Sequence, residues 1–526
     1  MASDDQQSIQ KLLQRLDALE KKLATLEAEN ARKDKIIAGL QQRLFGSSSE
    51  KLDPAQLQLL FDEIVMGKPA PPPDNGDETT TPEEPKTKRA TNRRSKADRF
   101  PQNLKILIEK TITPEEVLAN PDDWKLIGEE HTDELDVIKA QIFWRRTVRE
   151  KYVHNTNKSL PPVIAPAPLP SIPGTLIAPA LAAQIICDKY QDHLPHYRQA
   201  QRFRRRHDID IGRQTLNTWT HAIARHLAPI DQAIRAEILE SEKLQVDETP
   251  IDYLDPGHGT TREGRLWVYR DITHGTCYFD WHPSRATHCL LSFLGYDEQT
   301  NTIAYQGDIQ TDGYIVYQTV AAQHGLRHAG CLTHARRKFT DLGNACPEVT
   351  LPILLHIQRI YHIEKQTRQT GAPAACRELI RRARSRPIAE QLHRFLTEAS
   401  TQHLPASDVA KAIHYTLGQW QKIIHCFEDG TLELDTNLVE NIIRPTKLGM
   451  KNWMFFGSVE AGTNNAILFT LLANCNAQGL DPEDYLIEVL QRLSHNANRE
   501  QAAALTPRHI AAERKARAAT KDDQVA

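Results

Sequence analysis

Three acidic residues have types and settings that could form a catalytic metal site. Asp247 ends a β-rich run, and Asp312 ends a later strand-like run. Glu440 lies in a predicted helix that opens at Asp435 and stops near Pro445. Three carboxylates brought together suit hard divalent cations with oxygen ligands, Mg²⁺ or Mn²⁺ above all, and two such ions can activate a water or a 3′-hydroxyl for phosphodiester chemistry. Taken singly, an aspartate in either motif is more often a cap or turn residue than a metal ligand.

Basic residues close to the acids in the sequence could attract phosphate groups. These candidate phosphate contacts are His334, Arg336, Arg337 and Lys338 in THARRKF (333–339), and Arg444, Lys447 and Lys451 after Glu440. Each of them could instead form an ion pair within a helix. As a set, they favour a substrate that carries phosphate.

A series of strand-like segments must position the acids. The first lies within 241–254 and ends at Asp247, and the others lie at 264–272, 275–283, 302–314 and 326–334. A helix is predicted between the third and fourth strands and another between the fourth and fifth. This order of strands and helices is that of an RNase H-like fold, so residues 236–345 are predicted to form an RNase H-like α/β catalytic core. In such a sheet Asp247 and Asp312 would lie side by side.

Long helical sequences separate Asp312 from Glu440. They predict a helical insertion at 346–430, placed ahead of residues 431–495, which hold the Glu440 helix and the C-terminal helices. The third acid would therefore reach the other two only through the tertiary fold.

Residues 161–235 combine a Pro-rich connector (161–174) with a possible helix-turn-helix. The first predicted helix carries Arg202, Arg204, Arg205 and Arg206, and residues 208–212 break it. The second helix would open with Arg213, Gln214 and Thr215. In a helix-turn-helix, such N-terminal polar residues face the major groove of DNA. The alternative is a plain helical hairpin with a basic outer face.

The N-terminal part has a different character. Apolar residues at heptad spacing from 9 to 44 predict a coiled coil within 1–52 that self-associates, although a helix packed on its own domain is an alternative. Residues 53–99 are typical of a disordered linker, first acidic and Pro-rich and then basic. Residues 100–160 are predicted to form a small β-rich module, and residues 496–526 a basic, disordered tail. The chain is thus predicted to be a multidomain α+β protein.

Composition narrows the class of protein. The chain has 526 residues, a net charge of −3 and 25% charged residues, which is typical of globular proteins. No stretch approaches the ~20 apolar residues of a membrane span, and the acidic start MASDD is unlike a signal peptide. The 8 cysteines include no Cys-x-x-Cys pair, which argues against a disulfide scaffold and a Cys-based zinc site. We therefore expect a cytoplasmic protein with no membrane partner.

Several motifs resemble those of the insertion sequence 66 family of transposases, which are bacterial DDE recombinases. The matching blocks include VDETP (246–250), QTDGY (310–314), HARRKF (334–339) and LVENIIRPTKLGMKNWMFFGS (438–458). The resemblance implies that Asp247, Asp312 and Glu440 are the catalytic triad of a metal-dependent transposase. It also implies that the chain cuts element ends, joins their 3′-hydroxyls to target DNA, acts at the bacterial nucleoid and works with small accessory proteins from the same element.

The chain departs from this family in two places. The family commonly has a zinc-finger module with two Cys pairs, which WKLIGEE (124–130) and KYVHNTN (151–157) lack, so we expect a module without zinc. Near the catalytic Glu the family tends to have paired Asn and an Arg, whereas this chain has Thr436, Asn437 and Asn441. Two alternatives to an active transposase stay open. One is a DNA-binding remnant that no longer catalyses, and the other is a metal-dependent nuclease that cleaves without joining.

Overall fold

The computed structural model describes residues 114–119, 121–123, 140–153, 155, 161–343 and 346–522. The chain divides into two compact units, one made of Met1–Pro69 with Trp144–Ala526 and the other of Ala70–Phe143. The predicted coiled coil (9–44) and the predicted linker (53–99) lie outside the described residues, so both remain predictions.

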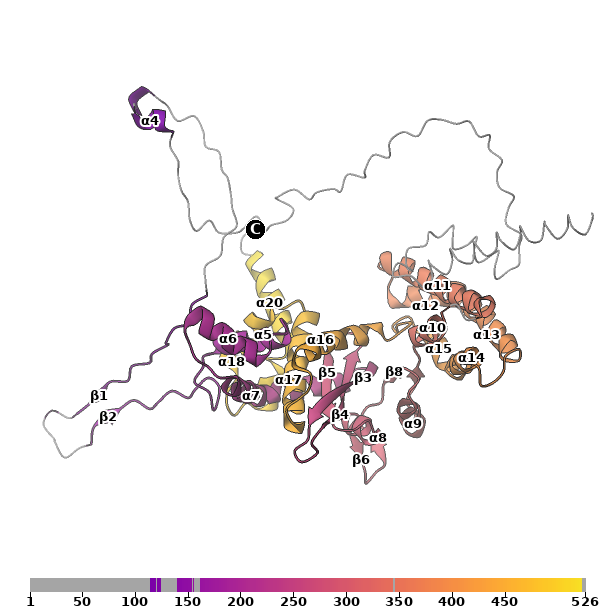
Figure 1. Ribbon diagram of the computed structural model, residues 1–526, viewed down its shortest axis with the longest axis horizontal. Helices are drawn as coiled ribbons and strands as arrows, with labels where there is room; N and C mark the ends of the chain where they lie inside the picture. Colours follow the sequence, from indigo (N-terminus) through magenta and orange to yellow (C-terminus); the bar gives the residue numbers. More distant parts are fainter. Residues whose placement is uncertain are drawn as a thin grey trace, which may run out of the picture. The chain divides into compact units, whose positions relative to one another are not determined.

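A five-stranded mixed sheet forms the centre of the larger unit (Figure 1). Its strands are β3 (Lys243–Leu254), β4 (Thr261–Asp271), β5 (Cys277–His282), β8 (Asp308–Gln310) and β9 (His328–Ala329). In space they follow the order β5-β4-β3-β8-β9. The pairs β3–β4 and β4–β5 are antiparallel, whereas β3–β8 and β8–β9 are parallel. Strand β4 buries four consecutive residues, Leu266 to Tyr269, which is typical of a strand covered on both faces.

Helices join the strands in the order that the sequence predicts. Helix α8 (Thr287–Phe293) lies between β5 and β8, and α9 (Ile315–His324) lies between β8 and β9. The predicted fourth strand at 302–314 is wrong in extent. It contains two short strands, β7 (Thr302–Ile303), which pairs with β6 (Tyr296–Asp297), and β8, which joins the main sheet. Because β7 and β8 belong to different sheets, no single strand could span the whole run.

Strand β3 is longer than predicted on the far side of Asp247. The sequence predicted that the run ends at Asp247, but β3 continues to Leu254. Strand β4 supplies the reason, because its antiparallel pairing with β3 extends as far as Leu254 opposite Thr261. Asp247 therefore lies within a strand that is paired along one edge, which holds its backbone more firmly than a strand end would.

The stretch predicted as an insertion is helical in the structure. Its elements are α11 (Pro347–Gln369), α12 (Ala374–Ile380), the π-helix η2 (Arg381–Ser385), α13 (Arg386–Ser400), α14 (Asp408–Gly418) and α15 (Trp420–Glu428). Apolar side chains of these helices share a core with Ala329 of β9 and with Leu332 and Phe339 of α10 (Leu332–Thr340). The insertion thus packs directly on the elements that follow Asp312.

Helix α16 (Asn437–Trp453) carries Glu440 and runs eight residues beyond Pro445, so the predicted stop at Pro445 is wrong. A proline inside a helix removes a backbone hydrogen bond and costs about 3 kcal/mol. The helix contacts β3 and β4, and it buries Val439, Ile443, Thr446 and Gly449 at helical spacing. Burial of this face offsets the cost, because tertiary packing outweighs local propensity.

Helices that precede or follow the sheet in the sequence complete the larger unit. They are α5 (Pro179–Tyr190), α6 (His196–His207) and α7 (Arg213–Leu239) before the sheet, and α17 (Val459–Ala477), α18 (Pro482–Arg492), α19 (Arg499–Ala503) and α20 (Pro507–Asp522) after it. Figure 1 shows α17 beside β5, where the Asn474 side chain bonds both backbone groups of Cys277. Among the described residues, none of the helices combines the length and apolar character that crossing a membrane would require.

Two further predictions change with the structure. The tail at 496–526 was predicted to be disordered, yet its described part forms α19 and α20, because Tyr485 donates to the Leu505 carbonyl and Arg514 contacts Glu488. Within 100–160, the described residues form α4 (Glu115–Ala119), the turn η1 (Pro121–Asp123) and the short strand β1 (Lys151–Tyr152), which pairs with β2 (Val163–Ile164). A β-rich module there remains a prediction for the rest of that segment.

Candidate active site

The parallel pairing of β3 with β8 brings Asp247 and Asp312 to equivalent positions. The paired register ends at Gln245 opposite Gln310. Asp247 and Asp312 each follow this last pair by two residues, and alternate residues of a strand point to the same face. This is the register that the predicted strand order required for the two aspartates.

Asp312 is held in the turn that follows β8. Its Oδ1 accepts a hydrogen bond from the Tyr314 amide at 2.9 Å. A Cβ on Gly313 would lie 2.7 Å from the ring of Tyr415, which belongs to α14. Glycine therefore allows the helical insertion to approach the backbone beside Asp312 closely.

Asp247 lies among negative charges. Burial, followed by the charges of the Glu248, Asp312 and Glu440 carboxylates, raises the pKa of the Asp247 carboxyl to about 8. The Glu248 amide, which donates to Asp247 Oδ1 at 2.9 Å, acts in the opposite direction. The three predicted acids are thus near enough to influence one another's charge, although β3, β8 and α16 are far apart in sequence.

Glu440 occupies the first turn of α16, where the helix dipole favours a negative charge. One carboxylate oxygen lies 3.3 Å from Arg337 Nη2, and the other lies 3.9 Å from His334 Nδ1, which is too far for a hydrogen bond. Within the described part of the chain, the buried atoms Glu440 Oε1 and His334 Nδ1 have no hydrogen-bond partner. Burial lowers the pKa of His334, although Asp312 and Glu440 favour its charged form.

The second acid of VDETP has a different environment from the first. Glu248 accepts a hydrogen bond from Arg285 Nε at 2.6 Å and another from the hydroxyl of Tyr317. The guanidinium of Arg285 also stacks 3.6 Å from the centre of the Tyr314 ring. Glu248 is therefore neutralised inside the fold, whereas Asp247 has no such ion pair with any residue that the structure describes.

The donor set suits a hard divalent cation. Asp247, Asp312 and Glu440 offer carboxylate oxygens, and Glu440 Oε1 is buried without a partner. Mg²⁺ and Mn²⁺ prefer such ligands. Across the described residues, no three His, Cys, Asp or Glu side chains are gathered at ligand spacing, so binding would require these carboxylates to turn toward a shared ion.

The predicted basic residues near the acids have varied partners. The Lys338 ammonium lies 5.1 Å from the centre of the Tyr415 ring, and Lys447 donates to the Pro250 carbonyl at 2.6 Å. Arg444 and Lys451 are exposed on α16, and Arg336 is partly exposed on α10. Arg337 and His334 face Glu440, as described above. Lys447 thus fixes α16 to β3, while Arg444 and Lys451 leave their charge to solvent.

Helices α6 and α7 are the two helices that the sequence predicted around the break at 208–212. Asp208, in a left-handed conformation, ends α6, and Arg213 begins α7. Arg202 points inward, where it donates to Asp188 at 2.8 Å. The remaining predicted contacts are exposed: Arg204, Arg205, Arg206, Arg213, Gln214 and Thr215. Arg204 lies 2.9 Å from Asp210, in a pair so exposed that it contributes little.

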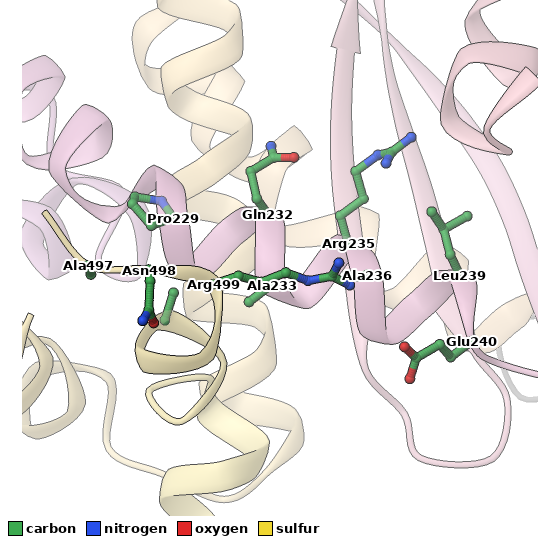
Figure 2. Close-up of a pocket in the computed structure, with 11 residues that line it drawn as sticks. Pro229, Gln232, Ala233, Arg235, Ala236, Leu239, Glu240, Ala497, Asn498 and Arg499 are labelled. Atoms are coloured by element: carbon green, nitrogen blue, oxygen red, sulfur yellow. The ribbon is translucent and has the colours of Figure 1, made fainter.

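A pocket of about 530 Å³ lies between the second half of α7 and the start of α19 (Figure 2). Its lining includes Gln232, Arg235, Glu240, Asn498 and Arg499, and none of the three acids or the predicted basic residues. Arg235 donates to the carbonyls of Ser292 and Phe293, so its charge is already engaged. The pocket is separate from the acid site.

Two glutamines at the centre of the site escaped the sequence analysis. Gln245 and Gln310 are fully buried, and Gln245 Nε2 donates to Gln310 Oε1 at 3.0 Å. The sequence holds only a weak signal for them, because Gln-x-Asp occurs at 245–247 and 310–312 but also at 306–308. Because the motifs at 306–308 and 310–312 lie on the same predicted strand, the pattern alone could not have shown which glutamine is buried beside Gln245.

Comparison with known proteins adds a second line of evidence. Residues 174–464 match the family model described as "Transposase IS66 family", and residues 34–106 match a model described as "Transposase C of IS166 homeodomain". Two similar proteins from Sinorhizobium fredii bear the names uncharacterized protein y4jD and uncharacterized protein y4qI. The first is 34% identical over 70% of this chain and 72% of its own length. The second is 29% identical over 73% of this chain and 71% of its own length.

Proposed function

Because this chain belongs to the IS66 transposase family, we propose that it is an active DNA transposase. It would bind the ends of its insertion sequence, hydrolyse a phosphodiester at each end and join the freed 3′-hydroxyl to target DNA. Membership of the family supports a role in transposition and the binding of DNA. The cleavage and joining steps are the part that the proposal adds.

The observation that carries the proposal is the shared environment of the three acids. Burial and the charges of Glu248, Asp312 and Glu440 raise the pKa of Asp247 to about 8. Neighbouring carboxylates whose negative charge is not fully balanced by Lys or Arg side chains of the protein are typical of catalytic metal sites. The strand order β5-β4-β3-β8-β9, with the last two strands parallel to β3, supports an RNase H-like assignment for the sheet.

Asp247, Asp312 and Glu440 would hold a pair of Mg²⁺ or Mn²⁺ ions. When bound, such ions activate a water or a 3′-hydroxyl and stabilise the leaving oxygen. The residues themselves would fix the ligand oxygens on β3, after β8 and on α16. Arg337, which now contacts Glu440, would be freed to meet a DNA phosphate. His334, Arg336, Lys338, Arg444 and Lys451 would extend this phosphate contact, and Lys447 would hold α16 in place.

Other parts of the chain would assemble the complex. The exposed basic side chains of α6 and the start of α7 would bind element ends. Residues 9–44 would self-associate, small proteins encoded by the same element would assist, and the complex would act on nucleoid DNA in the cytoplasm. The raised pKa of Asp247 also means that cation binding would release a proton, so metal affinity would rise with pH.

A strand-transfer assay tests the proposal. Labelled element-end DNA is incubated with the full chain, target DNA, and Mg²⁺ or Mn²⁺, and joined product is resolved on a denaturing gel. We expect product with the wild type and none with Glu440→Gln. Glu298→Gln removes an exposed carboxylate from a turn and should leave the yield unchanged.

The possible outcomes separate the alternatives. Cleavage without joining would identify a nuclease. Binding without cleavage, with the accessory proteins of the element also present, would identify a DNA-binding remnant and contradict the proposal.

A further inference from the structure

We propose that Gln245 and Gln310 are positioning residues that hold the strands and segments bearing the three acids in one arrangement. The inference rests on the proposed function, because it assigns these glutamines a part in metal binding. Both residues are fully buried, and each precedes one of the catalytic aspartates by two positions. Neither glutamine would contact the metal or the DNA.

The hydrogen bonds of the pair reach every element of the site. Gln245 Nε2 donates to Gln310 Oε1 at 3.0 Å and to the Asp435 carbonyl at 2.9 Å. Gln310 Nε2 donates to the carbonyls of Glu433 at 2.7 Å and Gly330 at 3.1 Å. The amides therefore tie β3 and β8 together, fasten both to the segment that leads into α16, and fasten β8 to the segment that leads into α10.

The orientation of each amide follows from its partners. Gln310 Oε1 and the Asp435 carbonyl are both acceptors, so the Gln245 side chain must present its amino group to them. The Glu433 and Gly330 carbonyls impose the same choice on Gln310. Because an amide group is planar and offers its donors at a fixed angle, the two glutamines set the spacing between the strands and the segment before Glu440.

Stability alone is a poor reason for this pair. Gln245 Oε1 is buried and, within the described residues, has no hydrogen-bond partner. An unpaired buried acceptor costs free energy, which offsets part of the stability that the pair contributes by donating to the Asp435, Glu433 and Gly330 carbonyls. The amides also fix the backbone segments that carry Asp247, Asp312 and Glu440. Residues that support metal ligands in this way control the affinity for the metal and the orientation of its ligands.

The test compares Gln245→Met and Gln310→Met with Asn474→Leu in the full chain. Asn474 is a matched control, because its buried amide also makes three hydrogen bonds, to Cys277 N, Cys277 O and the Thr470 carbonyl, and it ties α17 to β5. Each protein is assayed for Mn²⁺ binding without DNA, by electron paramagnetic resonance, and for single-turnover cleavage of end DNA. Melting temperatures give the loss of stability.

We expect each glutamine variant to weaken Mn²⁺ binding about 10- to 100-fold, as loss of groups behind metal ligands does. Cleavage at fixed Mn²⁺ should fall about 100-fold, since small misplacements of a reacting group have effects of that size, and added Mn²⁺ should restore part of it. Asn474→Leu should lower the melting temperature similarly and bind Mn²⁺ within about twofold of the wild type. Mn²⁺ binding and cleavage that match the control would overturn the inference.

A double variant, Gln245→Met with Gln310→Met, covers the case in which a single variant fails to fold. A single variant leaves the remaining glutamine without its partner amide, whereas the double variant loses only the donors to the Asp435, Glu433 and Gly330 carbonyls. If it folds and binds Mn²⁺ as the wild type does, the glutamines do not position the acids. A wild type that neither binds Mn²⁺ nor cuts DNA would instead contradict the proposed function. A wild type that does both, with glutamine variants that do the same, would contradict only this inference.

Discussion

Asp247 and Glu364 are both carboxylates held away from bulk water, and their surroundings are opposite. Burial favours the neutral form of Glu364, but hydrogen bonds and charge from Arg381, with help from Arg368, hold its pKa below the usual value. Arg381 is itself only 1% exposed, and it also donates to the carbonyls of Cys426, Asp429 and Leu432. Asp247 has other carboxylates for neighbours, which together with burial raise its pKa to about 8.

The difference separates a group that holds the fold from a group that awaits a ligand. A buried carboxylate with its own arginine has its charge satisfied by the chain, and removing either partner leaves the other uncompensated. Burial and neighbouring carboxylates raise the pKa of Asp247, so its ionised form is destabilised until a cation arrives from solution. Glu248, one residue after Asp247, belongs to the first kind, because Arg285 and Tyr317 satisfy it. Asp247 and Glu364 therefore differ in the charge of their neighbours rather than in their burial.

The largest effect is expected at the acid site. Asp312→Asn should lower strand joining at least about 10³-fold, because loss of one group that stabilises transition-state charge already costs about 10²–10³-fold. Binding of end DNA should stay within a few-fold of the wild type, because the exposed arginines of α6 are untouched. Gel-shift and strand-transfer assays on the same preparation measure the two quantities. Joining at the wild-type level would remove Asp312 from the metal site.

Glu364→Gln should instead destabilise the chain. It leaves the buried Arg381 guanidinium without its counter-charge, which costs about 3–5 kcal/mol when a buried ion pair is broken. Guanidinium-induced unfolding measures this loss. The matched control is Glu390→Gln, which removes the acid of the exposed pair with Arg386 and should change the unfolding free energy by less than about 0.5 kcal/mol. Equal losses in the two variants would show that Arg381 is satisfied by the backbone carbonyls alone.

The acid site could be predicted from the sequence more fully than the buried Glu–Arg pairs could. The succession of strands and helices could be predicted, because alternating apolar residues are a local feature. The adjacency of Asp247 and Asp312 could be predicted only through the RNase H-like fold that this succession indicates. Glu248–Arg285 and Glu364–Arg381 could not, because each pair joins residues from separate elements whose contact depends on packing. Periodicity also cannot show which strand a neighbour will extend, as β4 extends β3 past Asp247.

The same limit explains the incorrect helix boundaries. Pro445 is a correct local signal for a helix end, but the packed face of α16 outweighs it. The C-terminal tail is rich in basic residues, and its order depends on distant partners such as Glu488 for Arg514. Glu440 could be assigned to a helix from its own neighbours, whereas its contact with Arg337, 103 positions earlier, could not.

Asp231 shows whether a raised pKa is enough to mark a functional acid. It is 2% exposed on α7, and burial raises its pKa to about 7, although Tyr278 donates a hydrogen bond to it. Because the folded chain then binds more protons than the unfolded chain, the free energy of unfolding should fall as pH rises from about 4 to about 7.

Asp231→Asn should remove this pH dependence. At pH 8 it should stabilise the chain by about 4 kcal/mol, since the pKa is raised from 3.8 to about 7 and each pKa unit corresponds to about 1.4 kcal/mol. Near pH 4 the gain should vanish. Unfolding curves at the two pH values measure it. Strand joining should be unchanged, which makes this variant the counterpart of Asp312→Asn. Loss of joining in Asp231→Asn would mean that the acid cluster is not the sole group of acids on which the reaction depends.

The smallest effect extends the comparison to the arginines of α6. Arg202 lies against Asp188 inside the fold, whereas Arg205 is exposed. If Arg205 contacts a DNA phosphate, Arg205→Ala should weaken binding of end DNA a few-fold and reduce the slope of log affinity against log salt by about 0.9. Its melting temperature should not change. Arg202→Ala should lower the melting temperature and leave the affinity for end DNA and its salt slope unchanged. The reason is that it leaves the carboxylate of Asp188, only 8% exposed, without its cation. Fluorescence anisotropy across a salt series, with a melting curve for each protein, separates the two. An unchanged salt slope in Arg205→Ala would favour the plain helical hairpin, in which the basic face of α6 serves only solubility.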